Sequence, residues 1–116
     1  VFANGAFTLG ENIADHGGLQ IAFHAFQNAT KENGNAPVAE KDGFTPEQRF
    51  FLAYANVWAG NIRPEEILNR TKSDPHSLGR WRVNGALPHI GAWYDAWHVT
   101  PESPMYLAPE NRVSIW

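Results

Sequence analysis

The stretch that most constrains the fold runs from Thr45 to Gly60, where a helix start signal precedes a long apolar segment. Thr45 suits the N-cap, Pro46 suits the first helical position, and Gln48 completes a capping box. Gly60 is a residue favoured just after a helix ends. Apolar side chains cover nearly the whole circumference of this predicted helix, which favours a buried central position. The sequence therefore predicts a mainly α-helical chain.

Three further helices are predicted. The first runs from about Leu9 to Gln27, another opens at Arg63-Pro64 with acids in its first turn, and a last one covers Pro88 to Trp97. In the first of them an apolar stripe at helical spacing is the expected core face: Leu9, Ile13, Leu19, Phe23 and Phe26.

The segments between these helices are predicted from their glycine, proline and polar content. Residues 29–43 are expected to form a surface connection, residues 73–85 an ordered loop, and residues 101–109 an extended tail. Gly17 and Gly18 lie inside the first predicted helix. With nearby alanines they would form a surface of small residues that another helix could approach closely.

Composition excludes several classes of function. The apolar fraction of 43% is ordinary for a soluble protein, and a net charge of −3 is too weak to indicate nucleic acid or an anionic membrane as a partner. No run approaches the roughly 18–20 apolar residues of a membrane span. The chain has no cysteine, so a metal would need nitrogen or oxygen ligands.

Two carboxylates in the segment TLGENIAD would share one helix face, because Glu11 and Asp15 are four residues apart. On spacing alone, Thr8 and Glu11 favour a capping box over metal binding. A divalent metal with imidazole ligands is the other interpretation of the paired carboxylates.

The segment SDPHSLGRWRVNG contains a second candidate group of side chains. On its chemistry alone His76 beside Asp74 favours a surface hydrogen bond, and the neighbouring Arg80-Trp81-Arg82 favours a cation–π pair. Basic residues next to an aromatic also occur in nucleic-acid binders, which would show steeply salt-dependent affinity.

TLGENIADHGGL resembles the ENIAD segment of the neprilysin-type zinc metallopeptidases, a family that includes endothelin-converting enzymes and bacterial oligopeptidases. The resemblance implies that Glu11 is a ligand of a catalytic zinc. It also implies that Asp15 supports a histidine ligand and takes part in catalysis as a proton donor.

Two more segments carry the resemblance. DPHSLGRWRVNGAL is similar to the family's DPHSPGKFRVNGPL, which implies that His76 stabilises the oxyanion and Arg82 binds a substrate carbonyl. FTPEQRFFLAYANVWAG resembles the segment in which a Val-Trp pair, here Val57 and Trp58, lines the pocket for the side chain after the scissile bond. We further hypothesise that Asp74 orients His76.

The resemblance spans Gly5 to Trp116, but the chain contains no His-Glu-x-x-His, the helix motif that supplies two zinc ligands and the general base. Residues 1–116 are therefore expected to be the C-terminal helical part, with long ordered loops, of a zincin-type catalytic domain. The rest of the site would come from the upstream part of the same polypeptide. Alone, the segment is expected to be inactive, because one carboxylate holds zinc weakly.

In the complete protein the expected substrates are oligopeptides, cleaved before apolar residues. Ala59, Val99 and Val113 replace family cysteines, which indicates a bacterial-type member, with a periplasmic, cell-surface or secreted location favoured and a cytoplasmic one left open. The alternative is a noncatalytic helical binding domain derived from the same family.

Overall fold

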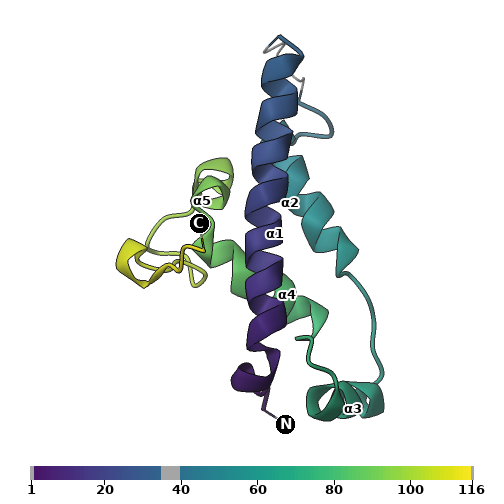
Figure 1. Ribbon diagram of the computed structural model, residues 1–116. Helices are drawn as coiled ribbons and strands as arrows, with labels where there is room; N and C mark the ends of the chain where they lie inside the picture. The colour runs from purple at the N-terminus through teal and green to yellow at the C-terminus, as the bar shows by residue number, and fades with distance from the viewer. Residues whose placement is uncertain (1, 35–39, 116) are drawn as a thin grey trace.

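The computed structural model describes residues 2–34 and 40–115 and is mainly helical, as predicted. The long helix α1 (Gly5–Glu32) runs the length of the molecule, and the other helices lie around it (Figure 1). They are α2 (Pro46–Val57), α3 (Pro64–Ser73), α4 (Gly79–Ala86) and α5 (Gly91–Trp97), with 3-10 turns η1 (Leu87–His89) and η2 (Pro109–Asn111). Of the helices described, none is long and apolar enough to cross a membrane.

The core lies where α1, α2 and the α4–α5 region meet. The Phe23 ring stacks on Phe51 of α2 with centroids 5.4 Å apart, and meets Phe50 edge-on at 5.2 Å. The buried apolar side chains are Leu19, Phe23, Phe51, Ala86, Leu87, Ile90, Trp93 and Tyr94. This core lies along the middle of α1 and leaves the first turns of the helix, with Glu11, outside it.

The start of α1 differs from the prediction. The helix begins at Gly5, because the Asn4 side chain accepts a hydrogen bond from the backbone N–H of Phe7 and acts as the N-cap. Thr8 is buried inside the helix, where its hydroxyl donates to the Asn4 carbonyl oxygen. The capping box of Thr8 and Glu11 is therefore wrong, which leaves the Glu11 carboxylate available for another role.

The helix start at Thr45 is confirmed, with both hydrogen bonds of the capping box present. The prediction of a buried central helix is wrong, because only Phe51 of α2 is buried, whereas Val57 is 70% exposed. The apolar stripe of α1 is also only partly buried, since Leu9 and Ile13 lie half-exposed. Both helices pack on one side and leave apolar surface uncovered on the other.

Three boundaries also differ from the prediction. The expected loop over residues 73–85 is wrong in its second half, where α4 begins at Gly79. The polar connection starts later than expected, because α1 continues to Glu32, and residues 35–39 of it lie outside the described part. The helix predicted from Pro88 is divided into η1 and α5.

Gly79 explains why α4 can begin where it does. A Cβ at this position would lie 2.6 Å from the carbonyl oxygen of Trp58, so the missing side chain permits close contact between α4 and the end of α2. Gly79→Ala is expected to destabilise the protein by roughly 1–3 kcal/mol through overpacking. Gly85→Ala in the same helix meets nothing within 4 Å, so it should be neutral or stabilise by up to about 1 kcal/mol. Denaturant unfolding of both variants would test this, and equal effects would contradict it.

The chain is less compact than an independent domain of its length. Its radius of gyration is 15.9 Å, compared with about 13 Å expected for a compact domain of this size. The principal extents of 48 × 32 × 27 Å reflect the long α1 and the α3 region, which lies apart from the core in Figure 1.

Candidate functional site

The two candidate motifs meet at the N-terminal part of α1. The Glu11 carboxylate points at His76, with Oε2 3.3 Å from Nε2, and both side chains are about half exposed, at 43% and 44%. Glu11 is placed by the second turn of α1, and His76 by the loop between α3 and α4. The structure therefore brings the predicted metal ligand and the predicted oxyanion donor into contact.

Asp74 holds His76 from the other side. Its Oδ1 lies 2.7 Å from His76 Nδ1 and also accepts the backbone N–H of His76 at 2.9 Å. The backbone hydrogen bond, followed by the imidazole contact, lowers the pKa of the Asp74 carboxyl from its ordinary value. Both ring nitrogens of His76 therefore face carboxylate oxygens, an arrangement in which a doubly protonated ring would donate at both.

Asn12 and Ser77, neither of which was predicted as a site residue, connect this loop to α1. The Ser77 hydroxyl donates to Asn12 Oδ1 at 2.8 Å, and Asn12 Nδ2 donates to the Thr8 hydroxyl at 3.2 Å. Asn12 follows Glu11 and Ser77 follows His76 in the sequence, so the hydrogen bond between Asn12 and Ser77 fixes the separation of Glu11 and His76. The sequence indicated a role for Asn12 and Ser77 only through their positions, because each directly follows a predicted site residue.

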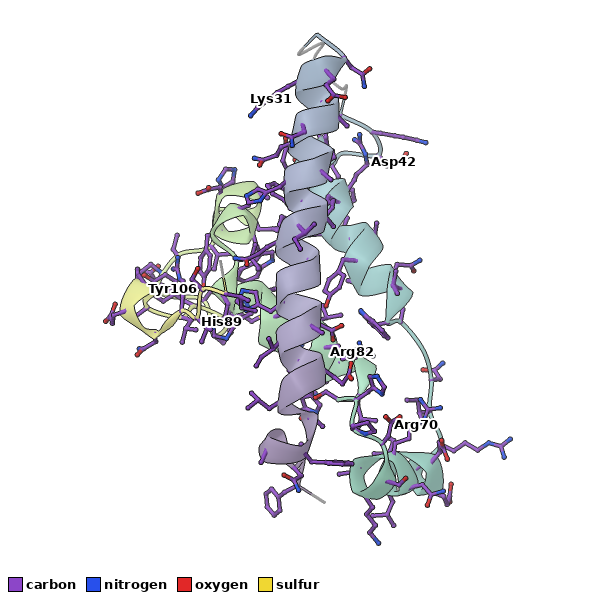
Figure 2. The ribbon with its side chains drawn as sticks, in the orientation of Figure 1. Lys31, Asp42, Arg70, Arg82, His89 and Tyr106 are labelled. Carbon is purple, nitrogen blue, oxygen red and sulfur yellow. The ribbon has the colours of Figure 1, made fainter. Side chains whose placement is uncertain are left out.

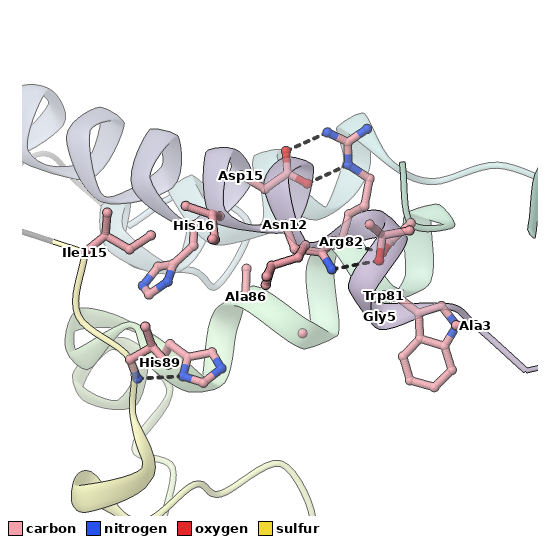
Figure 3. Close-up of a pocket in the computed structure, with 16 residues that line it drawn as sticks. Ala3, Gly5, Asn12, Asp15, His16, Trp81, Arg82, Ala86, His89 and Ile115 are labelled. Atoms are coloured by element: carbon pink, nitrogen blue, oxygen red, sulfur yellow. Dashed lines mark hydrogen bonds and ion pairs between the residues drawn. The ribbon is translucent and has the colours of Figure 1, made fainter. Parts of the chain in front are cut away.

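Asp15 and Arg82 form the second pair of the site. Arg82 Nε and Nη2 donate to the two oxygens of Asp15, each at 2.6 Å, and the side chains are only 14% and 12% exposed (Figure 3). The hydrogen bonds that Arg82 donates to Asp15 raise the pKa of Arg82 above its ordinary value. Among the described residues, the Asp15 carboxylate meets Arg82 rather than a histidine.

Val57 and Trp58 line two different cavities of the described chain. Trp58 lines a cavity with Asp74, His76 and Arg82, and its ring lies under the Arg82 guanidinium at 3.7 Å. Val57 faces a groove between α1 and α2, lined by Asp15, Tyr54 and small residues of α1. The small-residue surface of α1 therefore lies open toward this groove, with no helix of the described chain filling it.

A larger cavity of about 450 Å³ lies on the other side of Arg82, between α1, α4 and the C-terminal tail. In Figure 2, Arg82 lies to one side of α1 and His89 to the other. His16 and His89 line this cavity with ring centroids 5.5 Å apart (Figure 3). His89 Nδ1 accepts the backbone N–H of Val113 at 3.0 Å, which holds the tail. His16 is 5% exposed, and its Nε2 has no hydrogen-bond partner in the described chain.

This histidine pair predicts a loss of stability in acid. Burial, and then the charge of His89, lower the pKa of His16, and burial lowers that of His89. Below about pH 6.5 the unfolded chain therefore binds more protons than the folded one. The free energy of unfolding decreases as the pH is lowered, until the pH is below the folded-state pKa values.

His16→Gln should flatten this pH dependence of the unfolding temperature. His24→Gln, an exposed position on the same helix, should leave it unchanged. Equal slopes in the wild type and in His16→Gln would show that the pair does not titrate as described.

The described residues offer only part of a metal site. Within residues 2–34 and 40–115, no three histidine, aspartate or glutamate side chains gather where they could hold a metal ion. Glu11 nevertheless presents a half-exposed carboxylate oxygen, the hard donor that completes N/O zinc sites. Glu11 therefore fits one ligand position of such a site.

The chain is similar to known peptidases over nearly its whole length. The sequence profile of peptidase family M13 matches residues 2–113. The chain is 42% identical over 113 residues to neprilysin of Mus musculus and 41% identical to endothelin-converting enzyme 1 of Bos taurus, covering 97% of this chain and 15% of each relative. The inhibitor-bound structure of the Mycobacterium tuberculosis zinc metalloprotease Zmp1 superposes with a TM-score of 0.91 at 40% identity, covering 98% of this chain and 17% of that one. The chain thus spans about a sixth of the proteins it matches, and it belongs to peptidase family M13.

Proposed function

We propose that residues 1–116 are the C-terminal part of the catalytic domain of a neprilysin-like zinc metalloendopeptidase that hydrolyses oligopeptides. Glu11 would supply one zinc ligand, and the remaining ligands and the general base would come from the upstream part of the same polypeptide. The uncovered apolar side chains of α1 and α2, and the extended shape of the chain, support the presence of such a covering part. Ala59, Val99 and Val113, in place of family cysteines, support a bacterial-type member.

The contact between Glu11 and His76 carries the proposal. A hydrolytic site needs the metal ligand and an oxyanion donor on the same side of the cleft, and here their facing atoms are 3.3 Å apart. A noncatalytic helical domain would not need a carboxylate, an imidazole and a second carboxylate aligned as Glu11, His76 and Asp74 are.

The chemistry that zinc supplies when bound is activation of a water molecule and polarisation of the scissile carbonyl. The residues of this chain would contribute by orienting the substrate and by donating hydrogen bonds to it. His76, held at Nδ1 by Asp74, would donate from Nε2 to the oxyanion that develops as the peptide bond is attacked. Arg82 would bind a substrate carbonyl, and Asp15 would orient a histidine ligand while holding Arg82.

Val57 and Trp58 would border the site for the side chain that follows the scissile bond, which favours cleavage before apolar residues. Their separate cavities imply that they act on different parts of that site. Trp58 is the nearer of the two to the His76 and Arg82 cavity.

The test uses the intact protein, with zinc measured by elemental analysis and cleavage measured on a set of oligopeptides. We expect about one zinc per protein, loss of activity with a chelator and recovery on adding zinc. Intact protein that holds no zinc and cleaves no peptide would instead support the noncatalytic binding domain.

A further inference from the structure

We propose that Trp58 and Tyr54 are positioning residues that fix Arg82 so that its Nη1 group faces the substrate carbonyl. This inference deepens the proposed function and rests on it for the identity of the substrate. Trp58 would then hold Arg82 in place as well as border the pocket. Tyr54, which has no role in the proposed function, would hold the backbone of Arg82.

The hydrogen bonds of Arg82 leave one end of its guanidinium open. Nε and Nη2 donate to Asp15, and within the described chain Nη1 donates to no acceptor. A guanidinium has five N–H groups in a rigid planar fork, so fixing two of them sets the direction of the others. Arg82 also lines the cavity that contains His76, where a bound peptide backbone would lie.

Trp58 fixes the plane of that fork. The Arg82 guanidinium carbon lies 3.7 Å from the centre of the Trp58 ring, well within the distance of a cation–π contact. With Asp15 in the guanidinium plane and the indole against its face, the side chain is held along two directions. One face of the indole is therefore used by Arg82 and is not available to a substrate side chain.

Tyr54 fixes the backbone beneath the same residue. Its hydroxyl donates to the main-chain carbonyl of Arg82 at 3.0 Å and so joins α2 to α4. Burial, and then the nearby Asp15 charge, raise the pKa of Tyr54, so the hydroxyl stays protonated and able to donate. Arg82 is thus held by α1 through Asp15 and by α2 through Tyr54 and Trp58.

A double-mutant cycle in the intact protein tests this arrangement. Trp58→Leu keeps apolar bulk but removes the ring, and it should raise the KM for oligopeptides by roughly 2- to 30-fold, the range for a lost cation–π contact. Trp58→Phe, which keeps an aromatic face, should restore most of the affinity. Tyr54→Phe should raise KM by roughly 2- to 10-fold, as for one hydrogen bond. Asn56→Ala, an exposed position on α2, serves as the control.

The cycle is closed with Arg82→Met. If Trp58 acts through Arg82, Trp58→Leu should have little further effect on KM in the Arg82→Met protein, whatever side chain follows the scissile bond. If Trp58 is only a pocket wall, its effect should persist in that background and grow with the size of the substrate side chain, which would overturn the inference.

A second readout does not depend on peptidase activity. The same cycle measured in unfolding temperature should be non-additive, because Trp58 and Arg82 are in direct contact. Additive changes would overturn the inference even in an active enzyme. An inactive, zinc-free protein with non-additive changes in unfolding temperature would contradict the proposed function and still support the contact between Trp58 and Arg82.

Discussion

Glu11→Val in the intact protein is expected to remove bound zinc and peptidase activity together. The carboxylate that would bind the metal lies at the exposed end of α1, and the other carboxylate beside His76, that of Asp74, contacts the opposite ring nitrogen. Loss of a direct ligand should weaken zinc binding by more than the roughly 10- to 100-fold that loss of a supporting residue costs. Zinc content by elemental analysis and kcat/KM on an oligopeptide measure the two effects.

Two matched variants isolate the ligand role. Glu11→Asp keeps a carboxylate but shortens its reach, so it should retain part of the zinc. Glu65→Ala removes an exposed helix carboxylate on α3 and should change neither quantity. A Glu11→Val protein that keeps one zinc per molecule would show that Glu11 is not a ligand.

His76→Ala is expected to lower kcat by roughly 100- to 1000-fold while zinc is retained, which is the usual cost of removing one oxyanion donor. The imidazole is held by Asp74 and faces the cleft, so its removal leaves the metal ligand in place but removes the N–H that would meet the developing charge. Steady-state kinetics and zinc analysis of the same preparation make the measurement.

The control for this variant is His24→Ala, which removes an exposed histidine from α1 and should leave kcat unchanged. Asp74→Asn should have a smaller effect than His76→Ala, since it loosens the ring without removing it. If His76→Ala loses its zinc, or turns over normally, the oxyanion role is wrong.

The parts of the fold that were predicted correctly depend on local chemistry. Thr45, Pro46 and Gln48 are close in sequence, and each alone favours a helix start, so the beginning of α2 follows from the residues themselves. Thr8 was misassigned because Asn4, one turn earlier, is the stronger cap, and a helix has only one N-cap.

The parts that were missed depend on contacts between distant segments. The sequence around Gly79 favours a loop, and the helix forms there because the missing Cβ lets α4 rest on the Trp58 carbonyl. The extent of burial of α2 could not be predicted either, since it depends on which neighbours this chain supplies.

The candidate site was likewise predicted only in part. The motifs indicated the chemistry of Glu11 and His76, but their contact is set by the Asn12–Ser77 hydrogen bond across 65 residues of sequence. The bidentate contact between Asp15 and Arg82 was not predicted, because each had been assigned a separate partner. His16 gave no signal, since a buried histidine beside Asp15 looks like any other helical residue in the sequence.

The 28-residue helix α1 links parts of the site that lie at different positions along it. Glu11 and Asp15 are one turn apart on a stiff rod, and Phe23, farther along that rod, is seated in the aromatic core. A slide of the rod would carry both carboxylates by the same amount. Under the proposed function, repacking around Phe23 should therefore change metal affinity and peptide affinity together, so a core substitution would not alter one without the other.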